Sequence, residues 1–172
     1  MRRNNGGFTL IELIVVIVIL GILAVTAAPK FIDLQSDARL ATLNGMKAAI
    51  NSAVSLTYGK SLVTGQEKNE TGTVKINGEG VDVCYGYPCA EATKIQGVLD
   101  IGEFNECSES STAAGDWCYK QTDTKEINIY IANGYSESSK CFLKYEQAKK
   151  SGTGTDEKIA PPVVKLADDV DC

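Results

Sequence analysis

One apolar stretch near the start of the chain limits what this sequence can fold into. Residues 8–28 read FTLIELIVVIVILGILAVTAA, and Glu12 is the only charged side chain among them. As an α-helix this stretch is about 31 Å long, which matches the hydrocarbon thickness of a bilayer. Arg2 and Arg3 precede it, and no positive charge follows until Lys30. We therefore expect a transmembrane helix with a cytoplasmic N-terminus and a periplasmic remainder.

The same residues also have features of a secretory signal peptide. Arg2 and Arg3 would form its basic region, and the small residues within 24–28 would precede its cleavage site. The apolar run is long for such a peptide, however, and it contains Glu12 and ends directly before Pro29. This alternative predicts a soluble secreted binding protein or enzyme whose mature chain begins after Ala28.

A helical repeat continues beyond the apolar stretch. Mostly apolar side chains recur every three to four residues, and polar side chains lie on the opposite face of the helix. The face expected to be buried carries Leu40, Leu43, Met46, Ile50, Val54 and Thr57. The face expected to be exposed carries Asn44, Asn51 and Ser55. A helix from Phe8 to about Gly59 would be about 78 Å long. We expect its apolar half to project and its amphipathic half, residues 29–60, to pack on a globular domain.

Residues 61–172 have the short alternating runs and turn residues of a β-rich domain. The expected elements are a hairpin of 73–77 and 81–85 around a turn at 78–80, a short helix at 90–99, strands at 127–131 and 141–145, a polar loop at 149–156 and an edge strand at 163–166. The predicted fold class is α+β, with one long helix packed on an antiparallel sheet.

Composition narrows the possible functions. The formal charge is −5, or −5 − 2 = −7 without Arg2 and Arg3, so the surface should not attract nucleic acid. The chain has no histidine, which removes the usual general base and the imidazole metal ligands. We therefore expect no enzymatic activity, no cofactor and no metal site.

A short motif joins the basic leader to the apolar stretch: Gly6-Gly7-Phe8-Thr9-Leu10-Ile11-Glu12. It resembles the prepilin peptidase site of type IV pilins. The resemblance implies that a membrane-embedded aspartyl protease cuts between Gly7 and Phe8 and then methylates the new amine. Residues 1–7 would be the leader peptide, and their short length resembles the type IVa class.

Glu12 has a physical problem that this processing would solve. A carboxylate near the middle of a bilayer helix costs about 2.5–3.5 kcal/mol and needs a partner. Cleavage would create a positive amine at Phe8, one helical turn away, and a neighbouring chain packed with an axial offset could use it. Glu12 and Phe8 would then set the register of assembly. The alternative is a carboxyl group that burial keeps protonated and unpartnered.

Gly21 and Pro29 fall where type IVa pilins place a helix-weakening glycine and proline. Proline removes a backbone donor and glycine weakens a helix interior, so the helix should bend or fray there. The resemblance implies that this segment partly melts in a filament and makes it extensible. Alternatively, both are ordinary kink residues.

The six cysteines lie in the second half of the chain, in a loop-rich region after a membrane-type segment, which favours disulfides. A zinc site is the alternative, but the sequence has no C-x-x-C pair and no histidine. Pilins of this family close a C-terminal loop with one disulfide, for which Cys141–Cys172 is the candidate. Six cysteines allow fifteen connectivities, and the shortest nested loops add Cys84–Cys89 and Cys107–Cys118.

Three segments resemble a narrower group within this family, the mannose-sensitive haemagglutinin (MSHA) pilins. These segments are IVVIVILGILAVTAAPKF, residues 34–39 and the hairpin that leads into residues 85–88. The resemblance implies a major pilus subunit for adhesion, held in the inner membrane as a single-pass precursor and extracellular when assembled. Its implied partners are other copies of itself, the prepilin peptidase, the inner-membrane assembly platform, the outer-membrane secretin and a surface or host glycan. A minor pilin of the same pilus and a type II secretion pseudopilin are the alternatives.

Three weaker signals have simpler explanations. Asn69 begins a glycosylation sequon, but such short patterns arise by chance. The acidic tail of Asp168, Asp169 and Asp171 could contribute to a calcium site, although a solvated tail explains it as well. The aromatic residues Trp117, Tyr85, Tyr87 and Tyr119 could form a sugar-binding surface, although core and strand packing is the simpler explanation.

Overall fold

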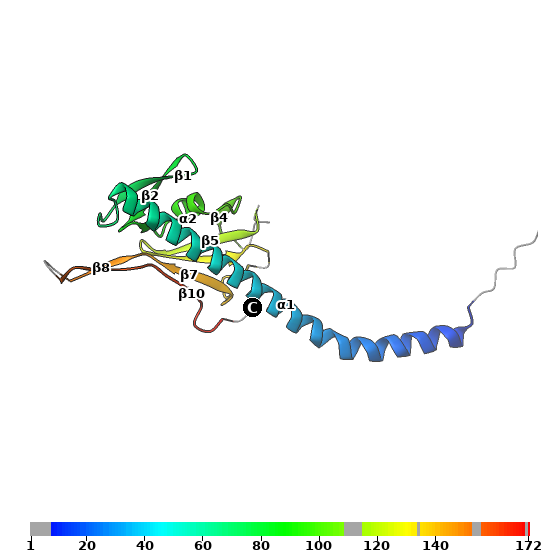
Figure 1. Cartoon of the computed structure of the whole chain (residues 1–172). Coiled ribbons are helices and arrows are strands. Elements are labelled where there is room, and N and C mark those ends of the chain that lie inside the picture. The colour runs from blue at the N-terminus through cyan, green and yellow to red at the C-terminus, as the bar shows by residue number, and fades with distance from the viewer. Residues whose placement is uncertain (1–7, 109–114, 134, 153–155, 171) are drawn as a thin grey trace, which may run out of the picture. The chain divides into compact units, whose positions relative to one another are not determined.

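The computed structural model describes residues 8–108, 115–133, 135–152, 156–170 and 172, and the side chains of residues 28–33 lie outside this description (Figure 1). The chain divides into two compact units, Met1–Ala38 and Arg39–Cys172. The expected domain bounds at residues 7, 28 and 60 remain predictions.

Helix α1 spans Leu10–Thr64, so it begins two residues later and ends about five residues later than expected. Its end is fixed by Gly65, whose φ of 68° is favourable for glycine. The amide of Gly65 donates to the carbonyl of Leu62 and that of Gln66 to Ser61. These two bonds form a Schellman motif, which satisfies carbonyls that the last helical turn would otherwise leave unpaired.

The amphipathic part of α1 buries the predicted face. Leu43, Met46, Ile50, Val54 and Thr57 are buried, whereas Leu40 is only partly covered. The outward set of Asn44, Asn51 and Ser55 is exposed, as expected. Periodicity therefore predicts correctly which side of this helix forms the core.

A three-stranded antiparallel sheet follows α1, in the order β1 (Gly72–Ile76), β2 (Glu79–Cys84), β3 (Tyr87–Pro88). The expected turn at 78–80 is wrong, because Ile76 pairs with Glu79 and the turn consists of Asn77 and Gly78. Both turn residues have positive φ, 52° and 91°. Asn-Gly is the preferred pair for this two-residue turn, because its twist matches that of the strands.

The second sheet has five strands in the order β10-β7-β6-β5-β4. They are β4 (Phe104–Glu106), β5 (Trp117–Asp123), β6 (Glu126–Ile131), β7 (Phe142–Glu146) and β10 (Val163–Leu166). The predicted strands at 127–131, 141–145 and 163–166 are confirmed, the last as an edge strand. All neighbours are antiparallel except β4 and β5, which pair in parallel.

Two further elements complete the domain. Helix α2 (Ala92–Val98) confirms the short helix expected at 90–99. The expected polar loop at 149–156 is wrong in part, because β8 (Lys149–Ser151) pairs with β9 (Lys158–Ala160) in a two-stranded ribbon. All three residues of β8 are exposed. An exposed ribbon has no apolar alternation, so the sequence pattern could not reveal it.

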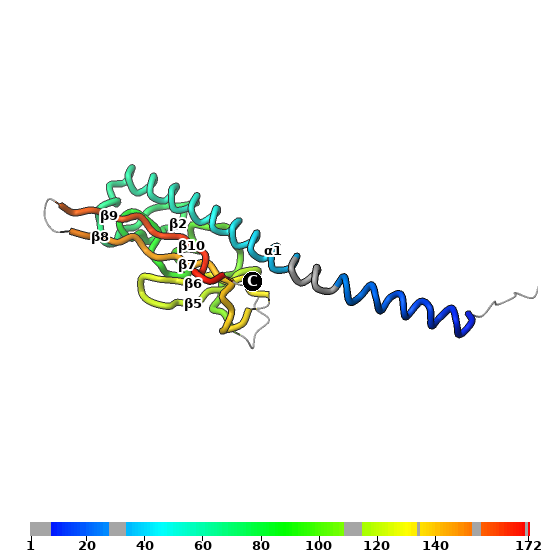
Figure 2. The backbone as a smooth tube through the Cα atoms, turned by 90° about the horizontal axis from the view of Figure 1, so that it is seen from below, coloured from blue at the N-terminus to red at the C-terminus, as the bar shows by residue number. Residues whose placement is uncertain are grey.

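One hydrophobic core joins α1, α2 and the five-stranded sheet. Figure 2 shows the C-terminal part of α1 running alongside the strands of this sheet. Leu43 and Ile50 of α1, Ile95 of α2, and Ile129 and Leu143 of the sheet are each at most 1% exposed. The residues 39–64 of α1 thus supply one wall of the core and the sheet supplies the other. This arrangement is the predicted packing of an amphipathic half-helix on a sheet.

The turn between β2 and β3 is held by three separate contacts. The hydroxyl of Tyr145 on β7 donates to the carbonyl of Pro88 at 2.6 Å, and Ser61 of α1 donates to the carbonyl of Gly86 at 2.8 Å. The ring of Tyr58 stacks on Tyr87 with a 4.5 Å centroid separation. These contacts connect the small sheet to both α1 and the large sheet. Burial raises the pKa of Tyr145 well above its ordinary value.

We expect Tyr145→Phe to lower the free energy of unfolding by about 1–3 kcal/mol, because it leaves the buried carbonyl of Pro88 without its donor. Thermal unfolding of the full chain in detergent would measure this.

The raised pKa of Tyr145 also predicts that the protein is sensitive to alkali. Tyr145 ionises at a lower pH in the unfolded chain than in the folded one, so the free energy of unfolding should fall as the pH rises above about 10. This component should vanish in Tyr145→Phe. Tyr119→Phe is the control, and equal losses in both variants would contradict the assignment.

Candidate functional site

The expected processing and assembly residues lie at the start of α1. Gly6 and Gly7, which precede the expected cleavage, lie outside the described residues. Phe8, the expected new N-terminus, is 93% exposed, and Glu12 in the first turn is also exposed. The helix begins at Leu10, which makes Thr9 its N-terminal capping residue.

Thr9 and Glu12 form a reciprocal pair of hydrogen bonds. The backbone amide and the hydroxyl of Thr9 both donate to Oε2 of Glu12 at 2.8 Å. In return, the amide of Glu12 donates to the Thr9 hydroxyl at 3.4 Å. This geometry is a capping box, in which two otherwise unsatisfied amides at the helix start each find a side-chain acceptor.

The capping box also orients the carboxylate. Both donors of Thr9 bond to the same oxygen, Oε2, and among the described residues Oε1 accepts no hydrogen bond. One oxygen of Glu12 is therefore held within its own helix while the other remains available for a donor from elsewhere. A positive amine is the strongest candidate, because charge-assisted bonds are about twice as strong as neutral ones.

The sequence reasoning missed this role of Thr9. Its signal was present, because a threonine followed three residues later by a glutamate and then by an apolar run is the signature of a capping box. The interpretation of Glu12 as a residue that needs only an external cation is therefore incomplete. Its carboxylate has a local partner in the single chain as well.

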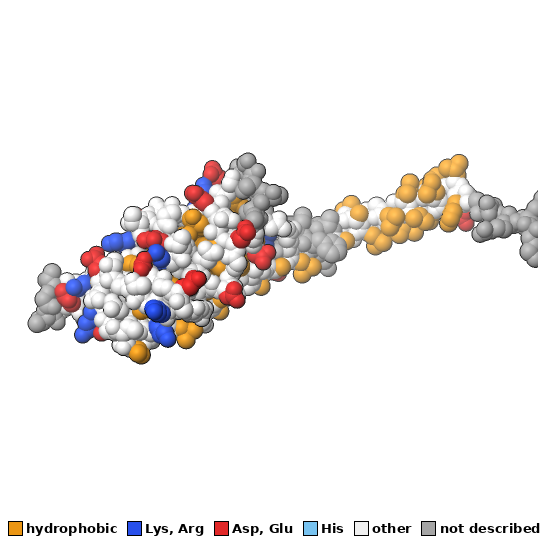
Figure 3. All heavy atoms as spheres, turned by 90° about the horizontal axis from the view of Figure 1, so that it is seen from above, with side chains coloured by type: hydrophobic (Ala, Val, Ile, Leu, Met, Phe, Trp, Pro, Cys, Tyr) orange, Lys and Arg blue, Asp and Glu red, His pale blue; other side chains and the backbone are white. Residues whose placement is uncertain are grey.

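The apolar part of α1 presents side chains on every side. Leu10–Ala27 has a mean hydropathy of 3.0 and, by length and composition, could cross a membrane. Its large apolar side chains are at least half exposed, including Ile14 at 51%, Leu20 at 58% and Val25 at 76% (Figure 3). Lipid or other protein surfaces must cover so much apolar area, because its exposure to water is unfavourable.

Gly21 and Pro29 both lie within α1, and the helix continues through both positions. A Cβ atom added at Gly21 would meet no other atom within 4 Å. In the single chain, a larger side chain would therefore fit at position 21. The side chain of Pro29 lies outside the described residues, and the expected flexibility at both positions remains a prediction.

Three disulfides fasten the β-rich unit. They join Cys84 to Cys89, Cys107 to Cys118 and Cys141 to Cys172, the three pairs selected by the sequence reasoning. The first closes the turn between β2 and β3, the second connects β5 to the residue that follows β4, and the third fixes the end of the chain beside β7. The third closes a loop of 31 residues and should contribute about 3–4 kcal/mol in the chain-entropy model.

The other candidate sites have structural explanations. Asp168 pairs with Lys165 and Asp169 with Lys140, Asp171 lies outside the described residues, and no group of three potential metal ligands occurs in the described part of the chain. The aromatic residues divide among separate contacts: Tyr87 on Tyr58, Tyr119 on Phe104, and Trp117 against the core. Asn69 is exposed and bonds to Gln66.

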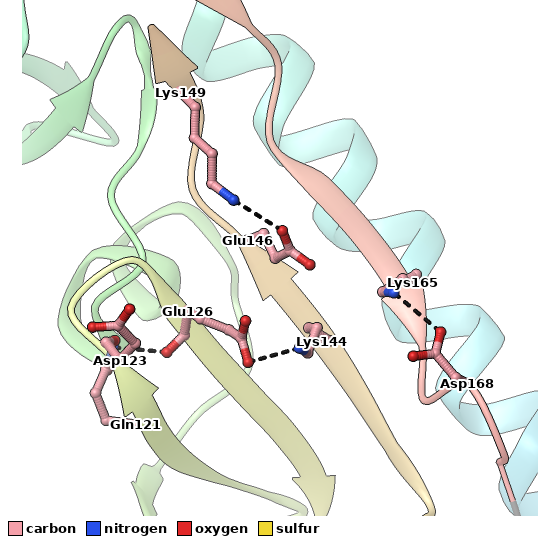
Figure 4. A network of polar contacts seen from close by, with 8 residues as sticks. All are labelled: Gln121, Asp123, Glu126, Lys144, Glu146, Lys149, Lys165 and Asp168. Atoms are coloured by element: carbon pink, nitrogen blue, oxygen red, sulfur yellow. Dashed lines mark hydrogen bonds and ion pairs between the residues drawn. The ribbon is translucent and has the colours of Figure 1, made fainter. Parts of the chain in front are cut away.

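The charged side chains on the large sheet form short surface pairs (Figure 4). Lys144 on β7 contacts Glu126 on β6 at 2.8 Å, and this bond raises the pKa of Lys144. Lys149 contacts Glu146 at 3.2 Å. Lys144 and Glu126 are half-buried and Lys149 is exposed, and ion pairs that solvent still reaches contribute about 0–1 kcal/mol each. The Lys144–Glu126 pair joins the neighbouring strands β6 and β7, and neither pair resembles an acid–base site.

We expect Thr9→Ala to remove the capping box and Thr9→Ser to keep it. Loss of a capping side chain costs about 1 kcal/mol, so amides in the first turn of α1 should exchange with solvent about fivefold faster in Thr9→Ala. Hydrogen–deuterium exchange of the full chain in detergent micelles measures this. Equal rates in the wild type and both variants would show that the capping box does not stabilise the helix start.

Comparison with known proteins identifies the N-terminal segment. Residues 2–28 match the family model of the prokaryotic N-terminal methylation motif. This range contains the capping box and the whole apolar stretch of residues 8–28. No solved structure matches the chain.

Two curated relatives share the same part of the chain. The type IV narrow pilus major component of Thermus thermophilus is 50% identical over 50 residues, which are 29% of this chain and 43% of that protein. The type II secretion system core protein G of Pseudomonas aeruginosa is 42% identical over 55 residues, which are 32% of this chain and 39% of that protein. The chain thus spans less than half the length of either relative.

The long apolar helix, the largely antiparallel sheet and the three disulfides together fit the type IV pilin fold. Both relatives are named as components of pilus or secretion systems, and neither is named as an enzyme. The chain thus carries the prokaryotic N-terminal methylation motif at residues 2–28, followed by an α+β architecture that fits the type IV pilin fold.

Proposed function

We propose that this chain is the major structural subunit of a type IV pilus. A prepilin peptidase cleaves it between Gly7 and Phe8, methylates the amine of Phe8 and so prepares it for polymerisation into a surface filament. The observation that carries the proposal is the carboxylate of Glu12, which lies one turn from Phe8 in an exposed apolar helix and has only one oxygen engaged by its own chain.

The energetics of Glu12 favour assembly. In the bilayer its carboxylate costs about 2.5–3.5 kcal/mol at the helix centre and less near the interface. The amine created at Phe8 is the nearest positive group that processing can supply. A neighbouring helix, offset along the axis, can bring its own amine to the Glu12 carboxylate, so that both charges are paired in an apolar environment.

The apolar surface of Leu10–Ala27 provides the contact area for this assembly. In the membrane lipid covers it, and in a filament the same side chains cover one another, so the transfer does not expose them to water. Gly21 lies within this segment and Pro29 just after it, and both weaken the helix, which would let the filament core extend under load. The chain itself is then a building block and has no catalytic role.

The remaining partners follow from this role. The precursor is a single-pass protein of the inner membrane with a periplasmic C-terminal domain, and it meets the prepilin peptidase and the assembly platform there. The growing filament passes an outer-membrane secretin. The disulfide-fastened domain is displayed outside the cell, where an MSHA-type adhesive function would require contact with a surface or host glycan.

Two alternatives share the same processing. The similarity to a type II secretion core protein favours a pseudopilin as the second candidate. Deletion of the gene distinguishes them, because loss of secreted enzymes with intact surface fibres would indicate a pseudopilin. A minor pilin at the tip is the third candidate, and the abundance of the chain in purified fibres separates it from a major subunit.

N-terminal mass analysis of sheared surface filaments tests the proposal. We expect an abundant chain that begins at Phe8 and carries one additional methyl group. A chain that begins after Ala28 and is soluble in the medium would contradict the proposal and indicate an ordinary signal peptide. An intact Met1 in the filaments would contradict the proposed cleavage.

Glu12→Gln separates the charge of Glu12 from its capping role. Glutamine can also serve as the third residue of a capping box, so the helix start should be retained while the negative charge is lost. We expect normal cleavage but a yield of sheared filaments that falls by about tenfold or more, because the neighbouring amine is then buried without its counter-ion. Thr9→Ser is the matched control. Wild-type yield from Glu12→Gln would show that the charge is dispensable.

A further inference from the structure

The last turns of α1 have an unusual distribution of side chains. Their inner face buries the hydroxyls of Thr57 and Ser61, which bond to backbone carbonyls. Their outer face exposes Leu56 by 76% and Val63 by 86%. Core packing explains the inner hydroxyls, because their hydrogen bonds are satisfied, but it does not explain apolar residues on the outer face.

Leu56 belongs to a groove between α1 and two other elements of the β-rich unit. The groove has a volume of about 300 Å³. Its apolar walls come from Ala53 and Leu56 of α1, Ile76 of β1 and Val98 of α2, and its basic groups are Lys60 and Lys75. None of its lining residues is acidic. The groove is therefore suited to an occupant that is both apolar and negatively charged.

Lys60 and Lys75 are among the lysines that form no ion pair within the described part of the chain. Seven lysines of the described residues form ion pairs with a carboxylate: Lys94, Lys120, Lys140, Lys144, Lys149, Lys150 and Lys165. No carboxylate in the described part of the chain lies within ion-pair distance of Lys60 or Lys75. In a chain of net charge −5, two unpaired lysines beside an apolar groove point to an acidic partner.

One segment of this chain has the complementary chemistry. Asp168 and Asp169 are 85% and 86% exposed, and they are followed by the half-buried Val170. The segment is held in place by the Cys141–Cys172 disulfide and by the bond from the amide of Ala167 to Phe142. Its present ion pairs with Lys165 and Lys140 are exposed, so exchanging them for pairs with a neighbour costs little.

The groove and this acidic segment lie apart on the same β-rich unit. In Figure 1 the strand β1 at the groove and the end of the chain are well separated. The segment of one copy therefore cannot fill its own groove, but it can fill the groove of a second copy. A contact between two different surfaces of identical chains is heterologous, and repetition of such a contact produces an open filament when it does not close into a ring.

We propose that the groove of Leu56, Lys60, Lys75, Ile76 and Val98 binds the segment 168–170 of a neighbouring copy. Lys60 and Lys75 pair with Asp168 and Asp169, and Val170 contacts the apolar wall. The proposal deepens the proposed function, because it places a second contact between subunits in the β-rich units, separate from the apolar helices.

Charge reversal tests this contact in cells that assemble the full chain. The double variant Lys60→Glu and Lys75→Glu should reduce sheared filaments by about fivefold or more, because like charges now face each other across the contact. Adding Asp168→Lys and Asp169→Lys to the same chain should restore the filaments. The control, Lys125→Glu with Lys158→Glu, reverses two exposed lysines outside the groove and should leave the yield unchanged. Wild-type yield from the groove variant, or failure of the compensating pair to restore filaments, would overturn the proposal.

Carbodiimide cross-linking gives a readout that does not depend on filaments. Whole cells treated with the reagent should yield dimers in which Lys60 or Lys75 is joined by an amide bond to Asp168 or Asp169, identified by mass spectrometry. Dimers with this linkage but no surface filaments would contradict the proposed function and support the contact. Filaments without the linkage would support the function and overturn the contact.

Discussion

The proposed assembly depends on a single carboxylate placed where an apolar environment disfavours it. Glu12 is the only charged residue in the stretch 8–28, and a membrane or a packed filament core stabilises it only through hydrogen bonds or a counter-ion. Thr9 satisfies one of its oxygens within the helix. Under the proposed function, the other is satisfied by an amine that exists only after processing, so electrostatics would link assembly to cleavage.

The stability of the β-rich unit rests on its own core and cross-links. Its core is shared by α1, α2 and the five-stranded sheet, and its small sheet is held to them by Tyr145, Ser61 and the stack of Tyr58 on Tyr87. Three disulfides restrain the loops that such a small core cannot order. The amphipathic part of α1 supplies core residues, while its outer face exposes Leu56 and Val63.

Sequence patterns predicted the elements that have one buried face. Ile127, Ile129, Leu143 and Tyr145 alternate with polar residues, and all four are fully buried. The pattern does not cover the exposed ribbon of β8 and β9, or the parallel pairing of β4 with β5, which is a long-range contact. The turn at Asn77 was misplaced because two turn signals overlap there. The capping role of Thr9 was readable but overlooked, whereas the groove at Lys60 depends on segments distant in sequence.

Cryo-electron microscopy of the sheared filaments tests the central claim most directly. At side-chain resolution, the account predicts that Oε1 of Glu12 lies within about 3 Å of the methylated amine of Phe8 from a neighbouring copy, a typical distance for a charge-assisted hydrogen bond. Oε2 should still accept its bonds from Thr9. A filament in which Glu12 contacts only its own Thr9, while the amine of Phe8 is paired with another group or with solvent, would contradict the account.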